Sequence, residues 1–531
     1  MIDEANGCEG TENIQGSVCG CLGVLVKKLT NDPIYREKCA VTLCIYICFV
    51  VMGGVKGTLG PALTDLTMIS QADTGTLIVT FLYVGLTIGS LLSGVIYHRI
   101  NHCLLFAACS LLEAVITAAI PWCYVFHLML GSHLLVGFAQ GIADTAGNTE
   151  IIQLWSNDGG TKVVGLHLMF NFGGVVFPII IAPFLVNKKD IQSLTKSPPL
   201  LSSNDTYTTA SNQFDVATLT GVNVISGIGS QSFSPEILQT STDGVINATD
   251  STEREINLDL GTYTSRVYVA YLISACLFVV ISIFFIGVYC SVQKRNCSKK
   301  EISDFQKPVI KDSHTEKING YLKCIVLSIM VTIATISRAI DNAFAAYLTT
   351  FCTDTLGLTP QQGSFVTSLY FVFVVIGLAF GTALTKLMTT LVYEGIQIGL
   401  MVTALVLLTV SASYLFSTGV WISASLLGFG KSVALPLTLS WTNDSFLKIN
   451  GKLASVFFTS TMIASTTNPL LLGFLMENFT NMWFCYLLLI ESCILITFCV
   501  FAVIMTNYIR KYVRVSGEDI DKEIHLNEDM H

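Results

Sequence analysis

The stretch GIADTAGNTEIIQLW, residues 141 to 155, ends a long apolar run and contains Asp144, Asn148 and Glu150. The run is long enough to cross a bilayer as a helix, because about 20 apolar residues span the hydrocarbon core. A charge at the bilayer centre costs about 2.5 to 3.5 kcal/mol on insertion scales, and acidic residues in such positions are usually functional. The stretch therefore predicts a membrane helix that carries a functional carboxylate.

The whole chain has the composition of a membrane protein. Of its 531 residues, 52% are hydrophobic and 12% are charged, and its mean hydropathy is +0.63. The net charge is −8 and the basic residues are scattered, which argues against a nucleic-acid partner. No nucleophile elbow, phosphate loop or metal-ligand spacing occurs in the sequence, so we expect neither an enzyme nor a bound cofactor.

The apolar stretches predict an all-α membrane protein with twelve transmembrane helices. A transmembrane barrel is excluded because its strands are much shorter and alternate in hydrophobicity. The predicted helices cover residues 39 to 60, 74 to 97, 103 to 120, 124 to 152, 162 to 186, 265 to 290, 321 to 350, 364 to 386, 393 to 414, 420 to 441, 452 to 476 and 482 to 508.

Basic residues in the short connections predict the orientation of these helices. Lysine and arginine occur in the N-terminal segment, in the connections after even-numbered helices and in the tail. The opposite connections carry none, namely residues 61 to 73, 121 to 123, 351 to 363, 415 to 419 and 477 to 481. Because cytosolic connections are the basic ones, both termini are predicted to be cytosolic. We expect a monomer in the plasma membrane.

Two polar segments divide the chain. Residues 187 to 264 are rich in Ser, Thr, Asn and Asp and predict a mostly disordered external loop, in which Asn204 and Asn247 are glycosylation acceptors. Residues 291 to 320 predict a basic cytosolic linker. The expected parts are a cytosolic segment 1 to 38, a six-helix bundle 39 to 290 that includes the loop, the linker, a second six-helix bundle 321 to 508 and a cytosolic tail 509 to 531.

The two halves of the chain resemble each other. WSND from residue 155 recurs as WTND from residue 441, at the matching ends of the fourth and tenth predicted helices. Other matches in the same order are Gly75 with Gly363, Thr80 with Ser368, Gly89 with Gly377 and Pro178 with Pro469. Internal duplication of this kind is typical of transporters whose halves rock about a site at mid-membrane. We therefore predict two pseudo-symmetric six-helix bundles.

Polar residues share one face of the fourth predicted helix. The stripe consists of His133, Gly137, Gln140, Gly141, Asp144 and Asn148. Steps of three and four residues place them on one side, and the glycines allow a neighbouring helix to approach closely. This pattern predicts a cavity wall that includes Asp144. The alternative is a static pair between Asp144 and a buried cation, for which Lys56, Arg338 and Lys431 are available.

The seventh predicted helix contains SRAIDNAFAAYLTTF, residues 337 to 351, with Asp341 and Tyr347 at helical spacing. Tyr347 offers an aromatic face that suits the C–H side of a pyranose, and packing is the alternative. Arg338 is placed to neutralise Asp341 within the helix, and Lys431 has Asp341, Asp144 or an anionic substrate as possible partners. The amides expected to reach a central cavity are Gln140, Asn148, Asn171, Asn342 and Asn468.

Several of these motifs resemble a known family. GIADTAGNTEIIQLW, followed by GLHLMFNFGGVVFP at 165 to 178, resembles the fourth and fifth helices of the sodium-dependent glucose transporter-like group, the major facilitator superfamily domain-containing 4 family. LGPALTDL at 59 to 66, after the first predicted helix, and GFGKSVALP at 428 to 436 are also similar. More distantly, DTAGN at 144 to 148 resembles a motif of the fucose-proton symporter family. The resemblance implies the major facilitator fold.

The resemblance also implies a function. It indicates a secondary active transporter that moves a hexose by alternating access, coupled to sodium or protons at Asp144. Asn148 would lie beside the sugar, and Asp341 and Tyr347 match positions where the family usually has Glu and Trp. Lys56 and Lys431 stand where the family has no charge. The alternatives are therefore a uniporter, a carrier of another solute such as an organic anion bound by these lysines, and a membrane sensor that binds without translocating.

Overall fold

The computed structural model describes residues 30–72, 74–155, 159–186, 265–298, 320–385, 387–446 and 451–528. Outside the described residues lie the predicted external loop 187 to 264, with Asn204 and Asn247, and most of the predicted linker. Within the described parts nearly every residue is helical, and the connections are short turns.

The first half of the described chain forms six long helices, each of which overlaps a predicted crossing. They are α2 (Pro33–Ile69), α3 (Thr76–Ile96), α4 (His102–Ala119), α5 (Phe126–Trp155), α6 (Gly159–Ile181) and α9 (Tyr268–Ser298). The helix starts carry local signals. Asp32 accepts hydrogen bonds from the backbone N–H groups of Ile34 and Tyr35 at the start of α2, and Asn101 caps α4 in the same way.

The second half forms the remaining crossings. They are α10 (Gly320–Asp354), α11 (Pro360–Leu384), α12 (Thr390–Ser413), α13 (Ser417–Lys431), α14 (Ala434–Ser445), α15 (Gly451–Asn478) and α16 (Trp483–Glu528). Thr359 and Gln362 form a capping box at the start of α11. Eleven described segments are long and apolar enough to cross a membrane, with α13 and α14 counted as one, and α15 has 28 residues. The predicted twelve-helix all-α architecture is confirmed.

The tenth predicted crossing is not one continuous helix. It breaks at Ser432 and Val433, which separate α13 from α14. Pro436 explains the break, because proline has no backbone N–H to bond with the carbonyl group four residues earlier, at Ser432. The prediction of an unbroken helix over 420 to 441 is therefore wrong. The break makes Lys431 the last residue of α13.

The first crossing is longer than predicted. LGPALTDL lies inside α2, not after it, although Pro61 removes one hydrogen bond of the helix. Nearly all residues from Gly57 to Leu66 are buried, so tertiary packing keeps this segment helical. The carboxylate of Asp65 accepts hydrogen bonds from the backbone of Val186 and the hydroxyl of Ser265. It thus holds the two described residues that flank the predicted external loop.

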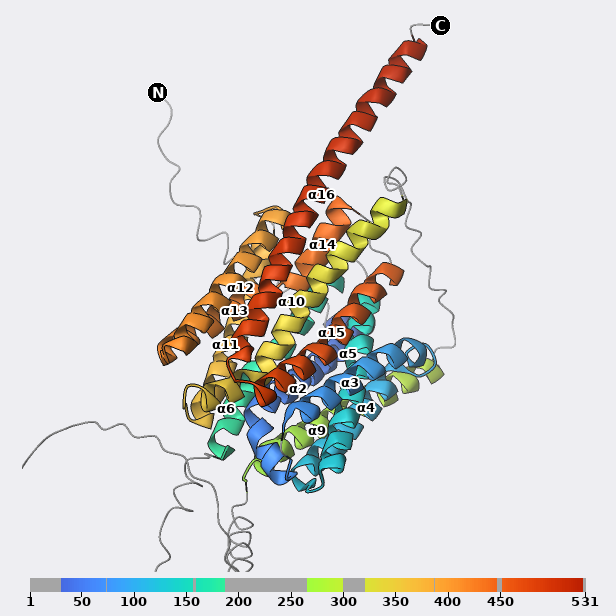
Figure 1. Cartoon of the computed structure of the whole chain (residues 1–531). Helices are drawn as coiled ribbons and strands as arrows, with labels where there is room; N and C mark the ends of the chain where they lie inside the picture. The colour runs from blue at the N-terminus through green and yellow to red at the C-terminus, as the bar shows by residue number, and fades with distance from the viewer. Residues whose placement is uncertain are drawn as a thin grey trace, which may run out of the picture. The chain divides into compact units, whose positions relative to one another are not determined.

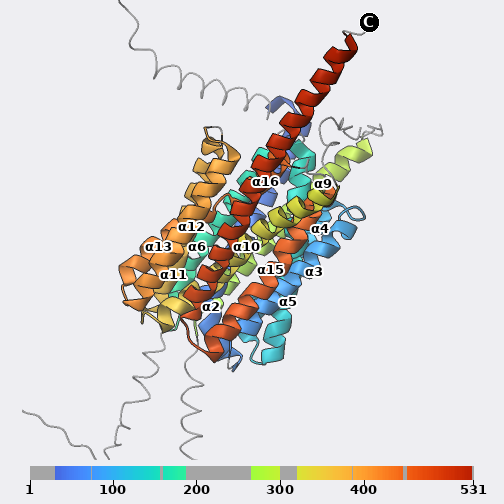
Figure 2. The same cartoon turned by 45° about the horizontal axis from the view of Figure 1, so that its top comes forward.

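The helices form two bundles that follow the two halves of the sequence (Figures 1 and 2). In the first bundle α3 packs on α5, α2 on α6 and α4 on α9. In the second bundle α10 packs on α16, and both α11 and α12 pack on α13. The bundles meet where α6 contacts α11, α3 contacts α15 and α2 contacts α10. Helices at matching places in the two halves therefore form the interface.

Glycines bring α3 and α5 close together. A Cβ atom on Gly85 or Gly89 would meet the backbone of α5, and one on Gly137 or Gly141 would meet the backbone of α3. This is the small-residue packing expected between membrane helices. The two glycines of the predicted stripe thus form a helix contact, and Asp144 lies beyond it on the same helix.

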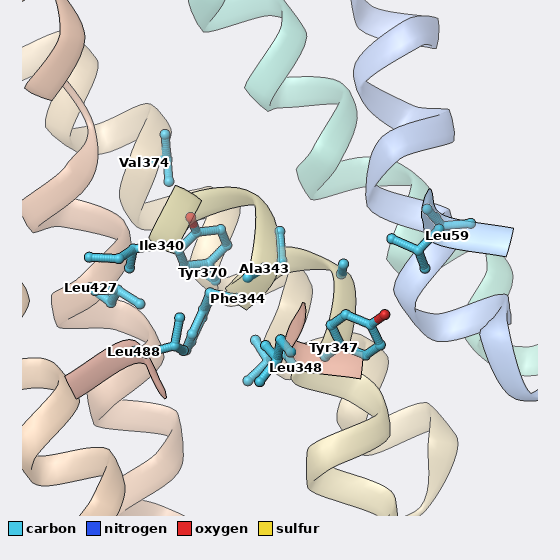
Figure 3. Packing of buried hydrophobic residues seen from close by; sticks show 14 of the residues in the cluster. Leu59, Ile340, Ala343, Phe344, Tyr347, Leu348, Tyr370, Val374, Leu427 and Leu488 are labelled. Atoms are coloured by element: carbon cyan, nitrogen blue, oxygen red, sulfur yellow. The ribbon is translucent and has the colours of Figure 1, made fainter. Parts of the chain in front are cut away.

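A buried apolar cluster connects the helices around α10 (Figure 3). Phe344 stacks on Phe484 of α16 and packs against the ring of Tyr370 of α11. Tyr347 and Leu59 belong to the same cluster, so it also reaches α2 in the other bundle. The charged residues of α10 lie at the edge of this apolar packing.

Candidate functional site

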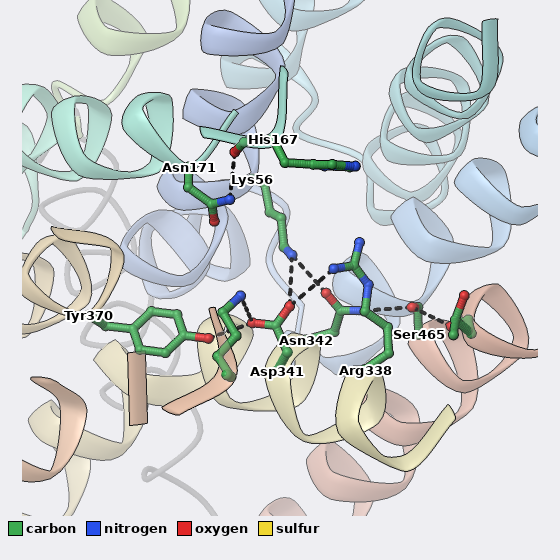
Figure 4. A network of polar contacts seen from close by, with 10 residues as sticks. Lys56, His167, Asn171, Arg338, Asp341, Asn342, Tyr370 and Ser465 are labelled. Atoms are coloured by element: carbon green, nitrogen blue, oxygen red, sulfur yellow. Dashed lines mark hydrogen bonds and ion pairs between the residues drawn. The ribbon is translucent and has the colours of Figure 1, made fainter. Parts of the chain in front are cut away.

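Asp341 is the centre of a charged cluster in the middle of α10 (Figure 4). Its side chain is 3% exposed. One carboxylate oxygen, Oδ1, accepts hydrogen bonds from Lys431 Nζ at 2.5 Å and from the Tyr370 hydroxyl at 2.5 Å. The other, Oδ2, lies 3.5 Å from a guanidinium nitrogen of Arg338 and 3.8 Å from Lys56 Nζ. The single carboxylate of Asp341 is thus the counter-charge of three cations.

Four helices from both bundles position this cluster. Lys56 comes from α2, Arg338 and Asp341 come from α10, Tyr370 comes from α11, and Lys431 ends α13. The end of α13 favours a cation, because the C-terminus of a helix carries partial negative charge. Lys431 Nζ also lies 5.4 Å from the centre of the Tyr370 ring, which adds a cation–π contact.

Lys56 connects the two bundles. Its Nζ donates a 2.7 Å hydrogen bond to the side-chain oxygen of Asn342 on α10. The amide nitrogen of Asn342 donates a 2.6 Å hydrogen bond to the hydroxyl of Ser465 on α15. A buried polar connection therefore runs from α2 through α10 to α15, close to the midpoints of these helices.

Asp144 is half-buried and differs from Asp341 in its partners. Its Oδ1 lies 3.4 Å from the amide nitrogen of Asn148, which donates a shorter hydrogen bond of 2.8 Å to the Asp144 backbone oxygen. Among the residues that the structure describes, no cation forms an ion pair with Asp144, although Arg338 and Lys56 lie within electrostatic range. Both lysines named in the sequence analysis thus pair with Asp341 and not with Asp144.

Matching positions in the two halves of the chain carry charges of opposite sign. Lys56 precedes the end of α2 by as many residues as Asp341 precedes the end of α10. Asp144 and Lys431 each lie about three turns before the tryptophan of the repeated WSND and WTND motif. Each bundle therefore carries one acid and one lysine on its first and fourth crossings, but the acid and the lysine exchange places between bundles.

Hydrogen bonds between the bundles lie near the middle of the helices and at one end. We call this end, where α2, α6, α10 and α15 finish and α3 and α11 begin, the closed end. The hydroxyl of Thr76 donates to Glu477 at 2.5 Å, and the hydroxyl of Ser364 donates to the Pro178 carbonyl oxygen at 2.6 Å.

Comparisons with known proteins agree with this architecture. The chain is 21% identical to sodium-dependent glucose transporter 1A of Mus musculus over 442 residues, which are 82% of this chain and 90% of that protein. It is 29% identical to major facilitator superfamily domain-containing protein 4A of Homo sapiens over 28% of this chain and 30% of that protein. A solved D-xylose-proton symporter matches with a TM-score of 0.55 at 12% identity, over 86% of this chain and 96% of that chain. No family model matches the chain.

The chain resembles transporters of the major facilitator superfamily. The predicted resemblance to the sodium-dependent glucose transporter-like group is confirmed by these relatives. The relatives are transporters and not enzymes, as the sequence predicted for this chain. It is a membrane protein with several crossings, and its relatives support a role in transport.

The predicted substrate residues of this chain occupy different surroundings. Asn148 on α5 and Asn171 on α6 are half-buried, and the amide nitrogen of Asn171 donates to the His167 carbonyl oxygen at 2.7 Å. Figure 4 shows Asn171 near Lys56. Gln140 is buried near Glu113 of α4, within the first bundle. Of these three amides, Asn148 and Asn171 are the ones with exposed area.

Two other predicted substrate residues are engaged in the protein interior. The Tyr347 side chain is 3% exposed, and its hydroxyl donates to the Pro469 carbonyl oxygen at 3.0 Å. Packing, the alternative interpretation of Tyr347, is therefore what the structure shows, and an open aromatic face for a sugar is not present there. Asn468 is also buried and donates to a carboxylate oxygen of Glu491 at 3.2 Å.

Some residues of the site were not found from the sequence. Tyr370 contacts Asp341 directly, Ser465 completes the Lys56–Asn342 connection, and Thr76 with Glu477 joins the bundles at the closed end. Serine, threonine and tyrosine are common in membrane helices, so the sequence alone did not mark these residues as part of the site. Glu477 lies at a helix end, where acidic residues are common and do not indicate a functional site.

Proposed function

We propose that this chain is a secondary active transporter that moves a hexose-type solute across the plasma membrane by alternating access. The observation that carries the proposal is the polar cluster around Asp341, which lies between two six-helix bundles that are hydrogen-bonded to each other beside the cluster and at the closed end. Sites at mid-membrane between repeated bundles are typical of secondary transporters. The relative named sodium-dependent glucose transporter 1A supports a sugar as the solute.

The basic residues in the short connections indicate which side of the membrane the closed end faces. With both termini in the cytosol, the closed end faces the outside of the cell, and we assign the structure to a state that is closed on the external side. Thr76 with Glu477 and Ser364 with the Pro178 carbonyl then seal the external side. In the opposite state these bonds open and the cytosolic ends of the bundles meet.

Asp144 is the carboxylate that we assign to ion coupling. Asp341 already has close cations, whereas Asp144 is half-buried and has no ion pair among the described residues. A transported sodium ion or proton therefore meets less competition at Asp144 than at Asp341. Burial of an unpaired carboxylate is unfavourable, so occupied Asp144 favours the closing of the site.

The repeat suggests how coupling works. Lys431 pairs with Asp341 inside the second bundle, and the matching pair inside the first bundle is Lys56 with Asp144. We assign this second pair to the outward-facing state. A cation that binds Asp144 then displaces Lys56, which crosses to Asn342 and Asp341 and closes the external side. A difference of about 1.4 kcal/mol between occupied and empty carrier shifts the two states tenfold.

Tracer uptake into proteoliposomes tests the proposal. The full chain is expected to accumulate labelled hexose against its gradient when an inward sodium or proton gradient is applied. Asp144→Asn is expected to abolish this gradient-driven accumulation and to retain exchange of labelled for unlabelled hexose. Asp354→Asn, at the exposed end of α10, is the matched control and is expected to behave as the native chain.

Two results would contradict this proposal. If Asp144→Asn left uptake and its ion dependence unchanged, the coupling role of Asp144 would be wrong. If the native chain bound hexose without any uptake or exchange, the protein would be a sensor and not a carrier. Hexose uptake that only equilibrates the solute and does not respond to an ion gradient would instead identify a uniporter.

A further inference from the structure

The formal charges around Asp341 do not balance. Lys56, Arg338 and Lys431 supply three positive charges, and Asp341 and Asp144 supply two negative charges within electrostatic range. His167 lies within range of Arg338 and Lys431 and adds no negative charge. Among the described residues, the cluster therefore has one surplus positive charge between two membrane bundles. A surplus charge that is withdrawn from water is unfavourable unless a counter-ion compensates it.

The surplus charge is located on Arg338. Lys431 is 11% exposed and bonds Asp341 at 2.5 Å, and Lys56 is 12% exposed and bonds Asn342 at 2.7 Å. The Arg338 side chain is 35% exposed, and its one side-chain contact among the described residues is the 3.5 Å approach to Asp341. Figure 4 shows its other amino nitrogen turned away from Asp341. Most of its five N–H donors are thus available to a ligand.

A guanidinium group with free donors matches a carboxylate. Its planar fork binds both carboxylate oxygens with two parallel hydrogen bonds, which is stronger and more specific than a single neutral hydrogen bond. Arg338 offers one such fork, which fits one carboxylate group. A cation at Asp144 increases the surplus positive charge of the cluster and therefore strengthens the binding of the anion.

Partly exposed amides near the cluster suit hydroxyl groups. Asn148 and Asn171 each use their amide nitrogen on the backbone of their own helix, at 2.8 Å and 2.7 Å. Their side-chain oxygens accept no hydrogen bond from the described residues and remain free to accept from a ligand hydroxyl. The combination of one free guanidinium fork and amide acceptors favours a solute with one carboxylate and several hydroxyls.

We propose that the hexose-type solute of this carrier is a sugar acid, a polyhydroxy monocarboxylate of the hexuronate type, and that Arg338 binds its carboxylate. This inference rests on the proposed transport function and narrows its substrate class. A neutral hexose of the same size makes the same hydrogen bonds through its hydroxyl groups but leaves the charge of Arg338 unpaired. It is therefore a weaker substrate at the same site.

The test uses the full chain in proteoliposomes with labelled D-glucuronate and labelled D-glucose as probes. At equal concentrations, glucuronate uptake is expected to exceed glucose uptake more than tenfold, and unlabelled glucuronate is expected to inhibit glucose uptake. If glucose is carried but glucuronate is neither carried nor inhibitory, the sugar-acid inference is wrong and the transport function stands. If neither sugar is carried or exchanged, the proposed transport of hexose-type solutes is itself wrong.

Variants test the role of Arg338. Arg338→Gln is expected to lower the ratio of glucuronate uptake to glucose uptake more than tenfold, because a neutral sugar does not use the guanidinium charge. Arg338→Lys is expected to recover part of the glucuronate uptake, and Arg266→Gln, an exposed arginine before α9, is the matched control. Size-exclusion profiles report folding. If well-folded Arg338→Gln carried glucuronate as the native chain does, Arg338 would not be its binding residue.

Discussion

Replacement of Asp341 by asparagine is expected to destabilise the protein much more than replacement of Lys431 by methionine. Asp341 is the shared counter-charge of Lys56, Arg338 and Lys431. Asp341→Asn removes the negative charge from all three. Lys431→Met leaves Asp341 with two cations and with the hydroxyl of Tyr370. The two members of one ion pair are therefore unequal in their importance.

The magnitudes follow from burial and distance. Removal of one partner of a buried ion pair costs about 3 to 5 kcal/mol, and the burial of Asp341, Lys431 and Lys56 places Asp341→Asn in this range. The contact to Arg338 adds little because a third of that side chain is exposed. For Lys431→Met we expect about 1.5 kcal/mol, the value of one charged hydrogen bond, since methionine keeps most of the packing volume.

The double variant Asp341→Asn with Lys431→Met is the decisive control. It has the same formal charge in the cluster as the native chain, so it is expected to recover at least half of the stability that Asp341→Asn loses. The free energy of unfolding is measured by titrating the purified variants from detergent into mixed micelles with a denaturing surfactant. Equal losses for the two single variants, or a double variant as unstable as Asp341→Asn, would refute the shared counter-charge.

Two further predictions concern packing and a polar contact outside the cluster. Gly137→Ala is expected to destabilise the protein by about 1 to 3 kcal/mol, because its Cβ would meet the backbone at Leu82, whereas Gly131→Ala has open space and should be neutral in the same unfolding titration. Tyr97→Phe removes the 2.7 Å hydrogen bond to Glu150 and is expected to cost about 1 kcal/mol. Burial and this bond raise the pKa of Tyr97 well above its ordinary value, so the phenol stays protonated and remains a donor at neutral pH; a Tyr97→Phe variant as stable as the native chain would contradict this account.

The architecture was predictable because membrane helices have a strong signal. A run of about 20 apolar residues has few alternative structures, and the basic connections set its direction. The exceptions involve proline. Pro436 breaks the tenth crossing and Pro61 does not end the first, because burial around Pro61 compensates for the lost hydrogen bond. Such compensation depends on tertiary contacts and leaves no local mark in the sequence.

The charged residues of the site were also predictable, but their pairing was not. Lys56, Arg338, Asp341 and Lys431 stand out because charges are rare in apolar runs. Helical spacing gives the face of a residue on its own helix and says nothing about the rotation of one helix against another. The choice between Asp144 and Asp341 as partner of the lysines therefore required coordinates. The choice between substrate contact and packing for Tyr347 was open in the sequence for the same reason, and in this structure its ring is packed against other helices.

The inverted arrangement of charges explains why one lysine is able to serve both carrier states. If both bundles had the lysine on the first crossing, two lysines would meet at the interface and repel each other. With Lys56 opposite Asp341 and Asn342, the interface is attractive in the state described. Lys56 has a second acid, Asp144, on its own bundle, and the two acids differ in how many other cations they hold. In the proposed mechanism, exchange between these unequal partners needs only a movement of the Lys56 side chain and its helix, and an ion or a proton at Asp144 changes the preferred partner.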